Sequence, residues 1–208
     1  MSFAKIAKLH NADKYFNRHY EPLYERILPL YRNLTRPIRL LEIGIDTGAS
    51  LCIWLEYFGA NNISIFGIDI SPKAIAAAPS EAITFLGDQA DATFLQRVIS
   101  QSGGQFDIVI DDGGHGIQQQ QVSFDVLWPE VVPGGVYIIE DLESSMARWG
   151  RREARVKKLA LTLDVIFGQI RGQMRQRRRE RFVRPLYTFC GEAVAIEKPG
   201  TLAGGPAK

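Results

Sequence analysis

The sequence predicts one α/β domain built on a mostly parallel, seven-stranded sheet that ends in an antiparallel hairpin. Two observations carry this prediction: apolar, strand-like runs alternate with helical segments over most of the chain, and two extended runs follow each other near its end. The 208 residues suffice for one well-packed domain. Because 46% of them are hydrophobic and 23% charged, the composition favours a soluble globular protein.

Each strand is predicted from a short apolar run. The first run is continuous up to Gly44, which is typical of a parallel strand buried on both faces. The second and third runs end in acids, Asp69 and Asp88. Pro133-Gly134-Gly135 indicates a turn before the fifth strand. The predicted strands are 38–44, 63–69, 83–88, 106–110, 136–139, 185–190 and 193–197.

Helical segments are predicted between the strands, and Pro72 suits the first turn of one of them. They are expected over 3–34, 49–58, from 71–72 onward, 91–101 and 117–130. The chain then divides into an N-terminal helical segment, a cofactor-binding domain with a basic helical insertion or lid, and a disordered tail rich in Gly, Pro and Ala. These parts are 1–36, 37–198 with the insertion at 148–184, and 199–208.

The turn after the first strand predicts a nucleoside-containing cofactor. Three residues separate Gly44 from Gly48, a glycine spacing that allows close approach of the backbone to a ligand, and Asp69 is placed to bind two ribose hydroxyls. A dinucleotide site would show G-x-G-x-x-G instead. Glu42 and Asp46 are poor neighbours for phosphate but suit the cationic S-adenosylmethionine (SAM). A glycine-rich turn that binds nothing is the alternative for this turn alone.

Further acids follow the fourth and fifth strands, where a ligand crevice is expected in an open parallel sheet. Asp112, Glu140 and Asp141 would converge there and could hold a hard cation such as Mg²⁺. Asp111 is expected to brace the loop, although we also count it among the candidate cofactor-binding residues. His115 has the pKa range of a general base. The alternative for each single acid is a helix cap or a turn.

Residues 148–184 form a strongly basic segment, with 13 Lys and Arg against 3 Asp and Glu. Such a segment can bind nucleic acid, a membrane surface or an anionic substrate, but a solvated helix face or a subunit contact is favoured. Apolar residues at helical spacing indicate an amphipathic helix with a buried stripe. They are Val156, Leu159, Leu163, Ile166, Phe167, Ile170 and Met174.

The order of these motifs resembles the metal-dependent sugar O-methyltransferases of macrolide and related antibiotic pathways, a mycinamicin-type family of class I SAM-dependent methyltransferases. The motifs are Leu41-Glu42-Ile43-Gly44, Gly67-Ile68-Asp69, Gly87-Asp88-Gln89-Ala90-Asp91, Asp111-Asp112-Gly113-Gly114-His115, Pro133-Gly134-Gly135-Val136-Tyr137 and Ile139-Glu140-Asp141-Leu142. The resemblance runs from about Asp13 to Leu142 and implies a Rossmann-like methyltransferase fold for 37–198. The family's members are longer, so its sugar specificity is not carried over.

The resemblance also implies roles for single residues. Asp112, Glu140 and Asp141 would bind Mg²⁺, and His115 would be the catalytic base. Asp69 would contact the ribose of SAM, and the Asp88-Gln89 turn would lie near adenine. The full set of predicted cofactor-binding residues is Glu42, Gly44, Gly48, Ser50, Asp69, Asp88, Gln89 and Asp111.

We therefore expect a SAM-dependent, Mg²⁺-dependent O-methyltransferase acting on a hydroxyl of a small molecule. The alternatives are a metal-free methyltransferase that uses the acids only as hydrogen-bond acceptors, a nucleic-acid methyltransferase that uses the Arg-rich segment, which we expect less, and a non-catalytic SAM-binding module. A homo-oligomer is expected from the amphipathic segment. Two cysteines, Cys52 and Cys190, form no disulfide framework, and no apolar stretch has the length of a signal peptide or membrane span, which predicts a cytoplasmic protein without membrane contact.

Overall fold

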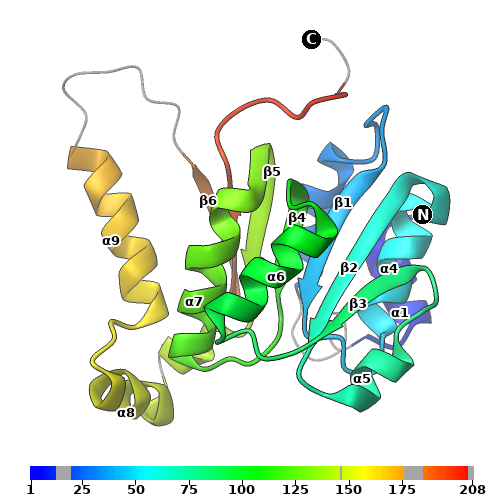
Figure 1. Cartoon of the computed structure of the whole chain (residues 1–208). Helices are drawn as coiled ribbons and strands as arrows, with labels where there is room; N and C mark the ends of the chain where they lie inside the picture. Colours follow the sequence, from blue (N-terminus) through cyan, green and yellow to red (C-terminus); the bar gives the residue numbers. More distant parts are fainter. Residues whose placement is uncertain (13–19, 146, 176–184, 206–208) are drawn as a thin grey trace.

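The computed structural model describes residues 1–12, 20–145, 147–175 and 185–205. Its centre is a seven-stranded sheet in the order β3-β2-β1-β4-β5-β7-β6 (Figure 1). The first five strands run parallel, and β7 pairs antiparallel with both β5 and β6, so the predicted fold class is confirmed. The strands are β1 (Ile38–Ile43), β2 (Ile63–Asp69), β3 (Ala82–Leu86), β4 (Phe106–Asp111), β5 (Val131–Ile139), β6 (Leu186–Cys190) and β7 (Ala193–Glu197).

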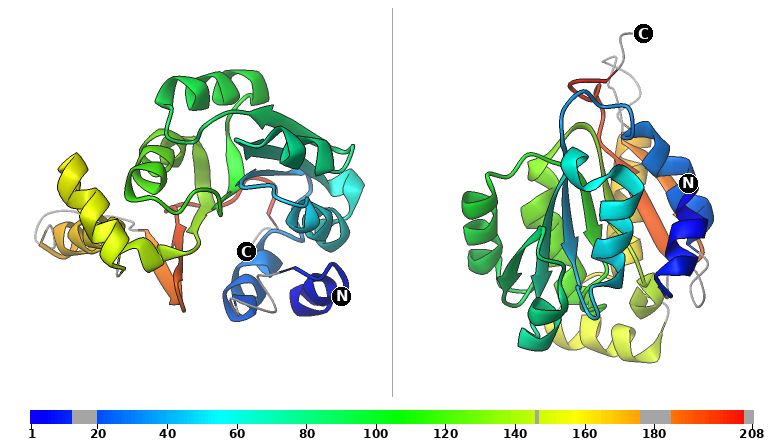
Figure 2. Two further views of the ribbon diagram at one scale, coloured as in Figure 1. Left: turned by 90° about the horizontal axis from the view of Figure 1, so that it is seen from below. Right: turned by 90° about the vertical axis from the view of Figure 1, so that its right-hand side faces the viewer.

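Helices cover both faces of this sheet (Figure 2). One face carries α1 (Phe3–Leu9), α3 (Glu21–Ile27), α4 (Ala49–Phe58) and α5 (Pro72–Ala77). The other carries α6 (Ala92–Ser102), α7 (Ile117–Leu127) and part of α9 (Thr162–Arg175), while α8 (Arg148–Lys157) lies below α7 in Figure 1. Short 3₁₀ turns are η1 (Leu28–Leu30), η2 (Ala60–Asn62), η3 (Trp128–Glu130) and η4 (Leu142–Ser145).

Burial on both faces explains why the strands are apolar throughout. Neighbouring side chains of a strand point to opposite faces, so Leu40 packs in the core beneath α1, α3 and α4, and Leu41 packs in the core beneath α6 and α7. Both side chains are fully buried. Within the described residues, no helix is both long and apolar enough to cross a membrane.

The start of the fifth strand differs from the prediction. β5 begins at Val131 instead of residue 136 and includes the Pro133-Gly134-Gly135 signal, near which its register with β4 shifts. The backbone there pairs with the chain after β7: the Gly134 amide donates to the Lys198 carbonyl (3.0 Å), and the Lys198 amide donates to the Gly135 carbonyl (2.7 Å). The glycine pair thus reflects close backbone contact within a strand and not a turn.

The basic segment is not one continuous amphipathic helix. α8 ends at Lys157, its C-cap Lys158 has a left-handed backbone (φ 55°), and α9 starts after a break. Of the predicted stripe, Ile166 is buried, whereas Val156 is 73% exposed and Phe167 is 43% exposed. The side chains of Ile170 and Met174, and all of residues 176–184, lie outside the described part.

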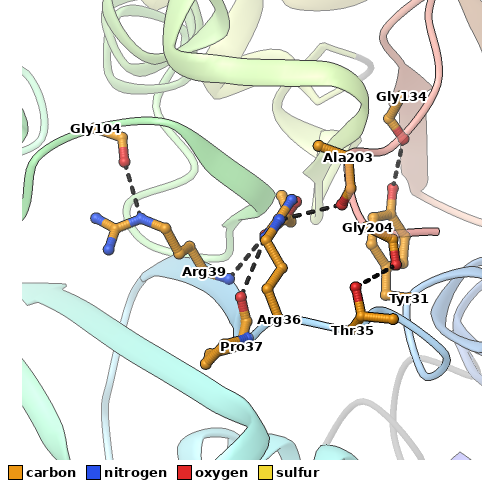
Figure 3. A network of polar contacts seen from close by, with 10 residues as sticks. Tyr31, Thr35, Arg36, Pro37, Arg39, Gly104, Gly134, Ala203 and Gly204 are labelled. Atoms are coloured by element: carbon orange, nitrogen blue, oxygen red, sulfur yellow. Dashed lines mark hydrogen bonds and ion pairs between the residues drawn. The ribbon is translucent and has the colours of Figure 1, made fainter.

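The predicted disordered tail is wrong for residues 199–205. The Thr35 amide donates to the Gly204 carbonyl (2.9 Å), and Nε of Arg36 donates to the Ala203 carbonyl (3.1 Å; Figure 3). Leu202 packs against the core. Residues 206–208 lie outside the described part. The Gly- and Pro-containing segment 199–205 therefore runs along the surface of the domain and is held there by hydrogen bonds.

Candidate active site

A cavity of about 1030 Å³ opens at the carboxyl ends of the parallel strands. Its walls are the loops after β1, β2, β3 and β4, with Asp141 after β5 and with Asn11 and Ala12 from the N-terminal segment. Its size fits a nucleoside-containing ligand. Eight of the predicted site residues line it: Gly44, Ser50, Asp69, Asp88, Gln89, Asp112, His115 and Asp141.

The two glycines of the first turn are required by the protein's own backbone. Gly44 has φ +92°, and a Cβ on it would lie 2.0 Å from the carbonyl oxygen of Asp112. Gly48 has φ +79°, and a Cβ there would lie 2.6 Å from the carbonyl oxygen of Ala77. Gly44 also lines the cavity, whereas Gly48 lies behind it as the N-cap of α4. The sequence predicts that these glycines allow a ligand to come close to the backbone. In the structure they allow neighbouring loops of the protein to come close to each other.

Asp69 ties two of the cavity loops together. Its Oδ2 accepts from the amides of Ile45 (2.8 Å) and Asp46 (3.2 Å), and its Oδ1 accepts from the amide of Ser71 (2.7 Å). A carboxylate offers about four acceptor positions, so Asp69 can also accept from a ligand hydroxyl. Asp88 likewise binds the Ala90 amide (2.8 Å) at the cavity wall.

Glu42 supports the site from behind and does not line the cavity. It is fully buried on the face of β1 that packs against α4. Its Oε2 accepts from the hydroxyl of Ser50 (2.9 Å) and from Nε1 of Trp54 (2.8 Å). Strand alternation directs the Glu42 side chain into the core, and Ser50, which it binds, reaches the cavity. A direct contact of Glu42 with the cofactor stays a prediction.

Asp111 and Gln89 form a buried network beneath the loop that carries His115. Nε2 of Gln89 donates to Asp111 Oδ1 (2.9 Å), and the Gly114 amide donates to Gln89 Oε1 (2.6 Å). The hydroxyl of Tyr137 donates to Asp111 Oδ2 (3.3 Å). Asp111 does not line the cavity and braces the loop from behind it, and its contact with the cofactor stays a prediction. The amide group of Gln89 is likewise committed to the loop.

Burial sets the ionisation of Asp111. Its side chain is removed from water, which raises the pKa to about 7, although hydrogen bonds from Gln89, a backbone amide and Tyr137 act in the opposite direction. The carboxyl group is thus poised to exchange a proton near neutral pH.

Three possible metal ligands converge at the cavity wall. One ligand atom each of Asp112, His115 and Asp141 lies within 4.8 Å of the others, and His115 Nε2 lies 3.3 Å from Asp141 Oδ2. Asp112 and Asp141 were predicted as ligands. Glu140, the third predicted ligand, lies outside this group; it is buried, and the hydroxyl of Tyr24 donates to its Oε1.

Two tyrosines position the acids after β5. Tyr20, at the start of α3, donates its hydroxyl to Asp141 Oδ1 (2.7 Å), and Tyr24, one turn later, binds Glu140. Burial, and then the hydrogen bond and charge of Asp141, raise the pKa of Tyr20 well above its ordinary value. Asp141 also has a left-handed backbone (φ 52°), which is uncommon for a residue other than glycine. Sequence reasoning assigned neither tyrosine a contact with these acids; their spacing of four residues is a local signal for side chains that point the same way.

Comparisons with known proteins agree with this geometry. A family model described as a methyltransferase domain matches residues 41–142. The 8-demethyl-8-(2-methoxy-alpha-L-rhamnosyl)-tetracenomycin-C 3'-O-methyltransferase of Streptomyces olivaceus is 41% identical over 146 residues, which are 66% of this chain and 36% of that protein. The Mycinamicin VI 2''-O-methyltransferase of Micromonospora griseorubida is 41% identical over 130 residues, 59% of this chain and 31% of that protein.

The solved structures include a relative with ligands bound. The MycE methyltransferase in complex with Mg, SAH (S-adenosylhomocysteine) and Mycinamycin VI matches with a TM-score of 0.80 and 27% identity, covering 100% of this chain and 56% of that one. The chain thus spans about a third of the length of these curated relatives and just over half of the solved structure. Residues 41–142 match a methyltransferase domain, and the chain has the Rossmann-like methyltransferase fold of this solved structure.

Proposed function

We propose that the chain transfers the methyl group of SAM to a hydroxyl of a small molecule, such as a sugar of a natural product. The observation that carries the proposal is that Asp112, His115 and Asp141 meet in the same cavity that Asp69 and the Gly44 turn line. The names of the relatives, which methylate sugar-bearing antibiotics, support an oxygen acceptor.

The donors at the cavity wall fit a divalent cation. Carboxylate oxygens are the ligands that Mg²⁺ prefers, and Asp112 and Asp141 supply them. Glu140, held by Tyr24, stays a predicted third ligand. When bound, Mg²⁺ would act as a Lewis acid that lowers the pKa of an acceptor hydroxyl. The chain's own part is to hold the carboxylates in place through Tyr20 and Tyr24.

His115 is proposed to take the proton of the acceptor hydroxyl. As the C–S bond of the sulfonium breaks and the new O–CH₃ bond forms, this proton has to leave the oxygen, and a neutral imidazole can accept it. The distance of His115 Nε2 to Asp141 also allows the imidazole to bind the metal. The two roles are separable: loss of a ligand weakens metal binding, whereas loss of a base lowers turnover with metal binding retained.

The first test is calorimetric titration of S-adenosylhomocysteine into the protein, with Mg²⁺ and with EDTA. Binding in either buffer should be followed by a labelled-methyl assay on rhamnosylated and macrolide acceptors, with and without added metal. Absence of binding in both buffers would reject the cofactor proposal. Binding without turnover on any acceptor would favour the non-catalytic alternative. A cytoplasmic location and a homo-oligomer stay predictions.

A further inference from the structure

The loop that carries His115 is rich in glycine and leads directly into α7. It runs from Asp112 to Gly116 and contains three glycines. Gly116 is the N-cap of α7 and has no side chain with which to bind the first amides of the helix. Gln119 partly compensates, because its Oε1 accepts from the Gly116 amide (3.2 Å). The amides of the first helical turn need another acceptor.

Glu153 of α8 supplies that acceptor from 36 residues away. Its Oε2 accepts from the Ile117 amide (2.9 Å), and its Oε1 accepts from the Gln118 amide (3.4 Å). Lys157 donates to both Glu153 Oε1 (3.1 Å) and Gln118 Oε1 (2.7 Å). Partial burial acts to raise the pKa of Glu153, but the Ile117 amide, Lys157 and the Gln118 amide outweigh it and lower the pKa. The carboxylate form is therefore stabilised at the positive end of α7.

α8 is seated by close packing and not by this contact alone. A Cβ on Gly150 would lie 1.8 Å from the carbonyl oxygen of Ser144, so the helix backbone rests directly on η4. Ala154 is buried, and the Leu163 amide after α8 donates to the hydroxyl of Ser145 (3.1 Å). Because η4 follows Asp141 directly, α8 connects the chain after β5 with the start of α7.

We propose that Glu153 is a positioning residue for the methyl-transfer site, acting through the first turn of α7 on the loop that holds His115. The basic segment thereby becomes part of the site's support, through the one acidic residue of α8. This inference rests on the proposed role of His115, but the contact of Glu153 with the α7 amides can be tested without turnover.

The test combines amide hydrogen exchange with steady-state kinetics. In Glu153→Ala, the amides of Ile117 and Gln118 should exchange at least ~10-fold faster, since the loop and first turn open more often. kcat should fall by about tenfold to a hundredfold because the base is misplaced. The affinity for S-adenosylhomocysteine and the KM for SAM should stay unchanged. Glu153→Gln keeps an acceptor oxygen and should restore most of kcat.

Two variants guard against a general folding defect. Arg155→Ala removes an exposed charge of the same helix and should leave exchange and kcat unchanged. Glu153→Asp keeps the charge but shortens the side chain, and it should lose protection at Ile117 as Glu153→Ala does. Unchanged exchange at Ile117 in Glu153→Ala, or faster exchange with wild-type kcat, would overturn the proposal. If the wild-type protein methylates no acceptor, the proposed function fails, and the exchange data alone decide whether Glu153 holds the loop.

Discussion

Substitution of Gly44 by alanine should damage both the stability and the site, because this glycine is where the loops after β1 and β4 touch. The added Cβ would lie 2.0 Å from the Asp112 carbonyl oxygen and 2.9 Å from Gly113 Cα, whereas real Cβ contacts are essentially never shorter than 3.0 Å. Both contacts are with backbone, so no side-chain rotation relieves them. The loop that leads to His115 has to retreat by about 1 Å or the turn has to change its path.

Two costs add up for Gly44→Ala. A residue with a Cβ loses about 1–2 kcal/mol in a left-handed backbone, which Gly44 adopts with φ +92°. Displacing packed backbone adds about 1–3 kcal/mol, so the free energy of unfolding should fall by about 2–5 kcal/mol. A displacement of about 1 Å at the loop should also lower methyl transfer by about a hundredfold.

Urea unfolding followed by circular dichroism measures the first effect, and the labelled-methyl assay measures the second. Gly168→Ala is the matched control: Gly168 lies inside α9, has no left-handed backbone, and a Cβ there would meet nothing within 4 Å. It should raise stability by about 0.5–1 kcal/mol, as expected for alanine in a helix. Equal unfolding midpoints and equal activity in Gly44→Ala and the wild-type protein would refute the argument.

Three further predictions concern ionisable groups. His115→Ala should lower kcat by about 10²–10⁴-fold while Mn²⁺ affinity, measured by electron paramagnetic resonance, is retained; weakened Mn²⁺ binding would identify His115 as a ligand instead. Asp111 has a folded-state pKa of about 7 against an ordinary 3.8, so the folded state holds a proton that the unfolded state releases. The free energy of unfolding of the wild-type protein should therefore fall as pH rises between these values. Urea titrations of Asp111→Asn across this pH range should show a smaller fall, and the two proteins should differ by roughly 4 kcal/mol at most. Arg36→Ala should lower the free energy of unfolding by about 3 kcal/mol, because the fully buried Asp107 would lose its ion-pair partner. This value is at the low end for a broken buried ion pair, because a third of the Arg36 side chain is exposed. A loss below about 1 kcal/mol in urea unfolding would contradict that assignment.

The sheet was predictable from sequence because its signals are local. β2 runs from Ile63 to Asp69 as predicted, and α4 from Ala49 to Phe58, since apolar runs and their ending glycines and acids lie within a few residues. The convergence of Asp112 and Asp141 followed from the rule that parallel strands present their carboxyl ends at one edge. The strand topology alone therefore predicts that acids after neighbouring parallel strands lie at the same edge of the sheet.

Side-chain direction was not predictable by the same reasoning. Glu42 and Asp111 both belong to strand ends, yet both point into the core, where Trp54 and Tyr137 bind them. The break at Lys158 carries no glycine or proline signal, so the helical period across it predicted one helix where two occur. The partners of Glu42 and Asp111 are more than ten residues away in the sequence, and periodicity carries no information about such partners.

Three of the side chains that hold the proposed catalytic groups come from outside the matched domain at 41–142. Tyr20 and Tyr24 precede it and bind the acids after β5; Glu153 follows it and binds the start of α7. The domain therefore fixes where the acids and His115 emerge and braces the loop through Gln89, and the flanking segments add the contacts that hold the acids and the start of α7. Since a positional change of about 1 Å can alter rate a hundredfold, substitutions in these flanks can change activity while the domain stays intact. Differences in catalysis among relatives that share this domain should accordingly be sought first in the segments on either side of it.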